Sequence, residues 1–349
     1  MTTQTTLDTM QNAMRLSDLS AMLLTCYEDE ALRRHSYMIF GPSGVGKSQV
    51  VAQVAAALNL PMVDIRLSQM DAVDGRGVPS VKNGFTVWNP VKFFPDSDTG
   101  ILFFDEVTSA PPSVQTLAYQ AMLDRKIGET VIPSGWMVLA AGNLQSDRGI
   151  THTLAAPLIN RMFVTTVTPH LDDWRIHAAM NDVDSRVIAF LGLRADLLHK
   201  FVPTEYVSGK QFPTPRGWFR VSDVVKRMGM LPEQIAHKMI VGSVGDEAGI
   251  AFIGFLQDSE GLVSLDMIFK NPENVPVPAE THKQYALAMG LATAMDKFTY
   301  DAGYKYLKRM NGDLQMLAAT LAYHKNPEAF MRAAMFKEFA PALVRINKL

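Results

Sequence analysis

Short apolar runs alternate with helical patterns between residues 36 and 168. The runs are the expected strands, and they lie at Ser36–Phe40, Met62–Arg66, Gly100–Phe104, Trp136–Ala141 and Met162–Val167. Their positions are mostly apolar without alternation, which is typical of strands that helices cover on both faces. We therefore predict an α/β fold with a parallel sheet core of five strands, followed by helices.

Two kinds of segment connect the expected strands. Residues Ser113–Arg125 carry apolar side chains three and four positions apart, which predicts a helix with one buried stripe. Two inserts interrupt the alternation, and both predict hairpins. Pro79–Trp88 contains an Asn-Gly pair between apolar residues, a strong hairpin signal, and Lys126–Ile132 turns near a glycine.

Helical patterns dominate after Pro169. The expected helices are His170–Leu198, Arg216–Met228, Pro232–Val241, Thr281–Lys297, Gly312–Ala322 and Glu328–Phe339. The chain therefore divides into an N-terminal helical segment (1–35), an α/β domain (36–168), a first helical domain (169–240) and a further helical region (241–349).

Composition narrows the class of protein. The 349 residues are 48% apolar and 19% charged, which excludes wholesale disorder. The formal net charge of −2 disfavours dedicated nucleic-acid binding. Cys26 is the single cysteine, so an intramolecular disulfide is impossible. The N-terminal residues lack the pattern of a secretion signal, and no run of about 18 apolar residues predicts a membrane span, so we expect a cytoplasmic protein.

One glycine-rich loop fits the pattern G-x-x-x-x-G-K-[ST] of a phosphate-binding loop. It reads Gly41-Pro42-Ser43-Gly44-Val45-Gly46-Lys47-Ser48. It follows the first expected strand and precedes an expected helix at Gln49–Leu58. Phosphate binding needs this context, because the N-terminus of the helix adds partial positive charge to the loop. Backbone N–H groups are expected to surround the β-phosphate, with Lys47 bridging the β- and γ-phosphates and Ser48 ligating Mg²⁺.

Two adjacent carboxylates end the third expected strand. We assign Asp105 to the Mg²⁺ shell and Glu106 to the attacking water. Taken alone, an apolar strand that ends in Asp-Glu is more often a capping or solvated pair, and only the phosphate loop upstream favours the catalytic assignment. Asn143 follows the fourth strand, so its amide is expected at the same edge, where it can hydrogen-bond the water or the γ-phosphate.

These three motifs, in this order, resemble Walker A, Walker B and sensor 1 of the AAA+ ATPases. Further strings resemble the MoxR-like, dynein-related branch: Arg66-Leu67-Ser68-Gln69, Asp74-Gly75-Arg76-Gly77-Val78-Pro79, Ser146-Asp147-Arg148-Gly149, Leu158-Ile159-Asn160-Arg161-Met162-Phe163, Asp172-Asp173-Trp174 and Thr214-Pro215-Arg216-Gly217-Trp218. The resemblance covers residues 36–221, and nothing beyond residue 240 resembles a known pattern.

The resemblance implies roles for three arginines. Arg161 resembles an arginine finger that completes the site of a neighbouring subunit, and Arg216 resembles the sensor 2 arginine of a helical lid at residues 169–240. Arg148 is a second candidate, which either bridges to the neighbour or holds Asn143 in position. For each arginine the alternative is a surface or interface salt bridge. Residues Phe85, Val87 and Trp88 of the first hairpin are either contacts to a partner or part of a packed hairpin.

The resemblance also implies a function. The protein is expected to form a homo-oligomeric ring of six subunits that hydrolyses ATP with Mg²⁺. The ring is expected to remodel or mature a client protein, which in this family often has a von Willebrand factor A domain. Nothing in the sequence identifies an adenine pocket, so ATP rather than GTP comes from the resemblance alone. Two alternatives stay open: a nucleic-acid motor or nucleotide-driven subunit of a restriction-like complex, and a non-catalytic scaffold switched by nucleotide.

Overall fold

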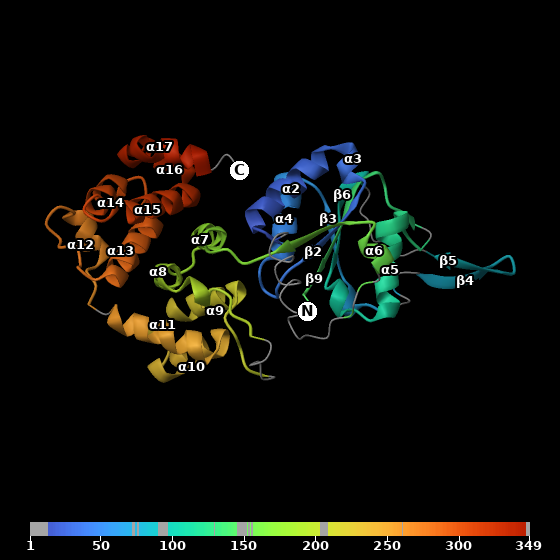
Figure 1. The fold of residues 1–349 in the computed structure, drawn as a ribbon, viewed down its shortest axis with the longest axis horizontal. Coiled ribbons are helices and arrows are strands. Elements are labelled where there is room, and N and C mark those ends of the chain that lie inside the picture. The colour runs from blue at the N-terminus through green and yellow to red at the C-terminus, as the bar shows by residue number, and fades with distance from the viewer. Residues whose placement is uncertain are drawn as a thin grey trace, which may run out of the picture. The chain divides into compact units, whose positions relative to one another are not determined.

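A computed structural model gives the fold of the chain (Figure 1). It describes residues 13–71, 74, 77–89, 97–128, 130–144, 152, 154, 156–202, 209–259 and 261–346. The chain forms two compact units, Met1–Thr168 and Pro169–Leu349.

A six-stranded parallel sheet is the core of the first unit. In spatial order its strands are β1 (Ala13–Met14), β10 (Phe163–Val167), β2 (Ser36–Phe40), β9 (Gly135–Gly142), β6 (Thr99–Asp105) and β3 (Met62–Arg66). The predicted α/β fold with a parallel core is thus confirmed, and the five predicted runs are the five longer strands. The prediction missed only β1, because this edge strand, which pairs with β10, has two residues and carries no periodic signal.

Helices cover both faces of this sheet, which explains why the strands lack alternation. Ile101 and Phe103 point into a core made with α2 (Leu16–Glu28) and α4 (Lys47–Ala57). Leu102 and Phe104, the alternate positions of the same strand, point into a second core made with α5 (Pro112–Asp124). The short helices of this unit are α3 (Glu30–Arg33), α6 (Ala156–Ile159), η1 (Leu67–Gln69) and η2 (Val107–Ser109).

Both predicted inserts are hairpins. Strands β4 (Val78–Lys82) and β5 (Phe85–Asn89) pair antiparallel, and Figure 1 shows them projecting from the rest of the α/β unit. Every side chain of these two strands is exposed, Val81 to 81%, so this is not a hairpin packed against the core. The second hairpin joins β7 (Lys126–Ile127) to β8 (Thr130–Val131), and Ile127 is buried.

The second unit consists of helices in its described part. They are α7 (Leu171–Met180), α8 (Ser185–Leu193), η4 (Ala195–Leu197), α9 (Pro215–Val225), η5 (Met228–Met230), α10 (Glu233–Val244), α11 (Asp246–Asp258), α12 (Leu265–Lys270), α13 (Thr281–Ala294), α14 (Tyr300–Leu307), α15 (Gly312–Lys325), α16 (Pro327–Arg332) and α17 (Ala334–Ile346). The single helix predicted over His170–Leu198 is wrong, because Asp182 adopts a left-handed φ of 57° and separates α7 from α8. The helix predicted over Glu328–Phe339 is likewise two, since Ala333 is extended.

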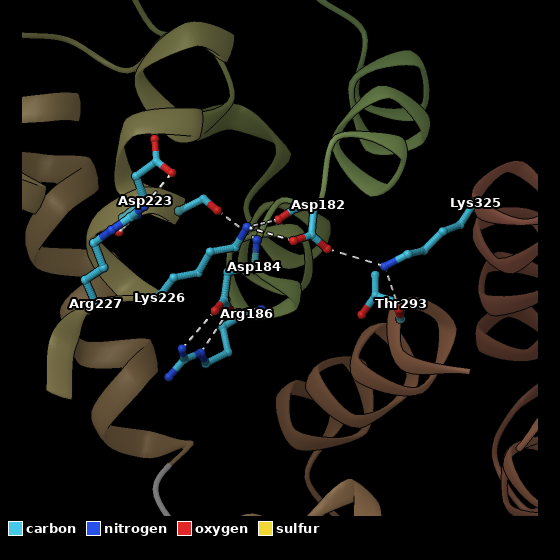
Figure 2. A network of polar contacts seen from close by, with 9 residues as sticks. Asp182, Asp184, Arg186, Asp223, Lys226, Arg227, Thr293 and Lys325 are labelled. Atoms are coloured by element: carbon cyan, nitrogen blue, oxygen red, sulfur yellow. Dashed lines mark hydrogen bonds and ion pairs between the residues drawn. The ribbon is translucent and has the colours of Figure 1, made fainter. Parts of the chain in front are cut away.

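One hydrophobic core runs through the whole second unit, from Trp174 on α7 to Leu343 on α17. Residues 169–240 and 241–349 therefore share their core. A polar junction also joins these segments, because Lys226 after α9 and Lys325 at the end of α15 both donate to the carboxylate of Asp182 (Figure 2). None of the helices in the described ranges combines the length and apolarity needed to cross a bilayer.

Candidate functional site

The phosphate loop joins β2 to α4, and its backbone needs glycine at defined positions. Gly44 and Gly46 have φ angles of 75° and 116°, a region that other residues rarely adopt. A Cβ on Gly41 would lie 2.6 Å from Cγ2 of Val167 and 2.8 Å from its carbonyl oxygen. The glycines of the motif therefore let the chain turn sharply at the carboxyl edge of the sheet, close against β10. Pro42 and Val45 are buried, and Ser43 is exposed.

The ammonium of Lys47 lies inside this loop and is only 7% exposed. Its Nζ donates to the carbonyl oxygens of Gly41, at 2.7 Å, and Pro42, at 3.1 Å. It also donates to Oδ1 of Asn143, at 3.0 Å. Three acceptors match the three donors of an ammonium, which offsets the cost of burying its charge.

Ser48 and Asp105 meet although 57 positions separate them. The Ser48 hydroxyl donates to Oδ2 of Asp105 at 2.5 Å, because α4 begins beside the end of β6. A hydroxyl and a carboxylate are hard oxygen donors, which Mg²⁺ prefers, and Mg²⁺ commonly takes one or two protein ligands plus water and phosphate. The donor set therefore fits Mg²⁺. The described residues contain no cluster of three His, Cys, Asp or Glu side chains suited to a metal.

Glu106 follows Asp105 with a left-handed backbone, φ 58°. Its own N–H donates to Oδ1 of Asp105 at 2.8 Å, which anchors the turn. The exposed Glu106 side chain reaches η1, where the Ser68 hydroxyl donates to its Oε2. Ser68 lies in the segment Arg66–Gln69, which resembles the MoxR-like branch, but the sequence did not predict its contact with Glu106.

A third carboxylate makes this edge of the sheet acidic. Asp64 lies on β3, the strand next to β6. Burial raises the pKa of Asp64, and the negative charge of Asp105 raises it further. Arg66, whose Nε is 4.0 Å from Oδ2 of Asp64, opposes this effect. The accumulation of negative charge favours binding of a cation beside Asp105.

Asn143 follows β9 and brings its side chain to the phosphate loop, through the contact with Lys47. Its backbone is held by Thr108, a residue of η2 that sequence reasoning did not single out. The N–H of Asn143 donates to Oγ1 of Thr108 at 2.9 Å. The structure thus brings Lys47, Asn143, Ser48, Asp105 and Glu106 to one edge of the sheet.

Comparison with known families agrees with this geometry. Residues 36–188 match the sequence profile of the AAA domain (dynein-related subfamily). This segment is an AAA domain of that subfamily. Such a domain implies ATP binding, and the α/β unit accordingly has the P-loop AAA+ fold, followed in the chain by helices.

The structure describes the positions of two of the three arginines for which the sequence predicts a role. Arg161 follows α6 of the AAA domain, and its side chain is exposed, with no hydrogen bond or ion pair to any described residue. Arg216 is exposed in the first turn of α9 in the helical unit, where Thr214 caps the helix by accepting from the N–H of Gly217 at 3.0 Å. Arg148 lies outside the described residues.

Solved structures with similarity to the chain include other AAA+ proteins. The Holliday junction branch migration motor RuvB of Thermotoga maritima is 17% identical, over 75% of this chain and 77% of that chain, with a TM-score of 0.38. NtrX from Brucella abortus in complex with ADP is 17% identical, over 95% of this chain and 68% of that chain, with a TM-score of 0.32. Neither value is high enough to transfer function to this AAA domain. No curated protein sequence matches the chain.

Proposed function

We propose that the chain is a MoxR-like ATPase that forms a ring, hydrolyses ATP with Mg²⁺ and remodels a partner protein. The proposed hydrolysis is supported by one observation, the meeting of five polar side chains at one edge of the sheet. They are the ammonium of Lys47, the hydroxyl of Ser48 with the carboxylate of Asp105, the carboxylate of Glu106 and the amide of Asn143. Two contacts define it: Lys47 to Asn143 at 3.0 Å and Ser48 to Asp105 at 2.5 Å.

Each of these residues has a role that its chemistry supports. Lys47 exchanges the carbonyls of Gly41 and Pro42 for phosphate oxygens when ATP enters the loop. Ser48 and Asp105 would hold Mg²⁺, which would supply positive charge that shields the phosphates from one another. Glu106 orients the attacking water and accepts its proton.

Asn143 is adjacent to the position of the γ-phosphate because its amide oxygen is bonded to Lys47, the residue proposed to reach that phosphate. Its remaining amide donors are then available to the water or to a phosphate oxygen. In this scheme Glu106 and Asn143 contact the same water from two strands, β6 and β9, which are neighbours in the sheet.

The proposed ring follows from the arginines. An exposed Arg161 without an intramolecular partner in the described part of the chain suits a finger that enters the site of the next subunit. Finger arginines contribute about 10³ to 10⁵ in rate, so contact between subunits would control hydrolysis. Arg216, at the start of α9, is proposed as the sensor 2 arginine, and Arg148 as a second residue at the subunit boundary.

A protein client fits one further observation. The β4–β5 hairpin exposes five large apolar side chains: Val78, Val81, Phe85, Val87 and Trp88. Exposure of such a group to water is unfavourable, and it is typical of a surface that binds a partner. We propose that this hairpin contacts the client. The von Willebrand factor A domain is proposed as the client class on the family resemblance.

Steady-state ATPase measurement on the purified chain tests the proposal. The wild type should hydrolyse ATP, lose the activity on chelation of Mg²⁺ with EDTA, and elute as an oligomer when ATP is present. Wild-type protein without measurable turnover in an assembled ring would instead support the scaffold alternative. Stimulation by duplex DNA that falls steeply with rising salt would favour the nucleic-acid motor.

A further inference from the structure

Thr108 links two parts of the proposed catalytic site that belong to different strands. It is the middle residue of η2, the single 3₁₀ turn that directly follows Glu106. Its side chain contacts the backbone of Asn143 at the end of β9. We infer that Thr108 is a positioning residue, which fixes the distance between the carboxylate of Glu106 and the amide of Asn143. This inference rests on the proposed hydrolysis of ATP.

The contact between Thr108 and Asn143 has little freedom. Thr108 is 3% exposed, and its Oγ1 both accepts from the N–H of Asn143, at 2.9 Å, and donates to the carbonyl oxygen of Asn143, at 3.4 Å. Gly142 leaves room for this approach, because a Cβ there would lie 2.6 Å from Cγ2 of Thr108. The hydroxyl therefore forms a two-point clamp on one peptide segment, and the methyl group fills the space beside it.

The other side of the same turn is fixed from α5. Gln115 is buried, and its Nε2 donates to the carbonyl oxygens of Val107, at 3.0 Å, and Ala110, at 3.2 Å. Tyr119 in turn donates to Oε1 of Gln115 at 2.6 Å. A 3₁₀ turn held at both ends moves as one piece, so Thr108 transmits its position to Asn143 rather than adjusting locally.

The consequence for catalysis is a matter of geometry. Glu106 and Asn143 are proposed to contact the same water, and an error of about 1 Å in such an arrangement can cost about 100-fold in rate. The residues proposed to hold the nucleotide and its Mg²⁺ are Lys47, Ser48 and Asp105, and Thr108 contacts none of their side chains in the hydrogen bonds described. Loss of the Thr108 hydroxyl should therefore reduce kcat and leave the affinity for ATP nearly unchanged.

Two substitutions separate the hydroxyl from the shape of the side chain. Thr108→Val keeps the shape and removes the hydroxyl, and we expect kcat about 10- to 100-fold lower with KM within about threefold of the wild type. Thr108→Ser keeps the hydroxyl, and we expect it to recover most of the activity. Thr116→Val, the same change at an exposed site on α5, should have wild-type turnover.

A double-mutant cycle identifies the partner of Thr108. Asn143→Ala alone should reduce kcat, and adding Thr108→Val to it should cause little further loss, because the positioned group is already gone. If Asn143→Ala is inactive while Thr108→Val hydrolyses ATP normally, the inference fails and the proposed function stands. Multiplicative effects of the two changes, or an equal loss in Thr108→Ser and Thr108→Val, would also overturn the inference. Unchanged turnover in Asn143→Ala would contradict the proposed function itself.

Discussion

The ammonium of Lys47 is hydrogen-bonded to the side-chain oxygen of Asn143, 96 positions later in the chain, with 3.0 Å between Nζ and Oδ1. The start of α4 and the end of β9 are therefore joined by a polar contact. A phosphate that reaches Lys47 changes the surroundings of Asn143 at the same time. In the proposed function, phosphate binding at Lys47 and the action of Asn143 on the γ-phosphate would thus be coupled through this one contact.

Replacement of Lys47 by methionine tests its role in binding. Lys47→Met keeps the length of the side chain and removes the charge that is expected to contact phosphate. A charge-assisted hydrogen bond contributes about 1.5–3 kcal/mol, so we expect about 10- to 150-fold weaker ATP binding by titration calorimetry. Lys126→Met, at an exposed position of the second hairpin, is a suitable control and should bind ATP normally.

Mixing two inactive variants tests whether Arg161 acts on a neighbouring subunit. Glu106→Gln should bind ATP without turnover, since a general base contributes about 10² to 10⁴ in rate, and Arg161→Ala should do the same for lack of the finger. In a mixed ring, a Glu106→Gln subunit supplies an intact Arg161 to the site of an Arg161→Ala subunit. Activity should therefore return on mixing. Mixtures as inactive as the separate variants would contradict action between subunits.

Gly41 is expected to tolerate no side chain. In Gly41→Ala the new methyl group would press on Cγ2 and the carbonyl oxygen of Val167, and such overpacking costs about 1–3 kcal/mol. The variant should melt at a lower temperature and bind ATP more weakly, because the Gly41 carbonyl shifts with its Lys47 partner. Gly242→Ala is the matched control. Gly242 is exposed within α10 with open space around it, so alanine there should raise the stability by about 0.5–1 kcal/mol.

The junction at Asp182 should make the stability of the helical unit depend on pH. The hydrogen bond from Lys226 lowers the pKa of Asp182, and Lys325 adds to the effect. A carboxyl group with a lowered pKa in the folded state stabilises the fold above the ordinary pKa, about 3.9, and loses this contribution as the pH falls through its folded value. Because the Asp182 side chain is 81% exposed, the contribution is screened and should stay below about 1 kcal/mol.

Asp182→Asn isolates this charge, since asparagine tolerates the left-handed backbone of this position. We expect a melting temperature about 1–3 °C below that of the wild type at pH 7. The difference should vanish in acid, where the wild-type carboxylate is also neutral. A deficit of equal size at pH 7 and in acid would show that the charge plays no part. Asp258→Asn, at the exposed C-terminal end of α11, should not lower the melting temperature at either pH value, because a negative charge there opposes the helix dipole.

Much of the α/β unit was predictable because its signals are local. Each of the five longer strands is a continuous apolar run, and parallel strands carry their carboxyl ends to one edge, so the meeting of Ser48, Asp105 and Asn143 follows from sequence order. The contacts of Thr108 and Ser68 were not predictable, because a serine or threonine in a loop gives no indication of its distant partner. The break at Asp182 was not predicted for a different reason, because aspartate occurs both in helices and in turns.

The strand β10 has a consequence that reaches beyond one subunit. Arg161 lies two residues before it, and Val167, its last residue, touches the space beside Gly41 where the phosphate loop begins. Five residues of extended chain span about 16 Å and hardly stretch. In the proposed ring, each protomer would thus hold its nucleotide near one end of β10 and present Arg161 to the neighbouring subunit near the other end. A rigid strand would then transmit movement from each ATP site to the next.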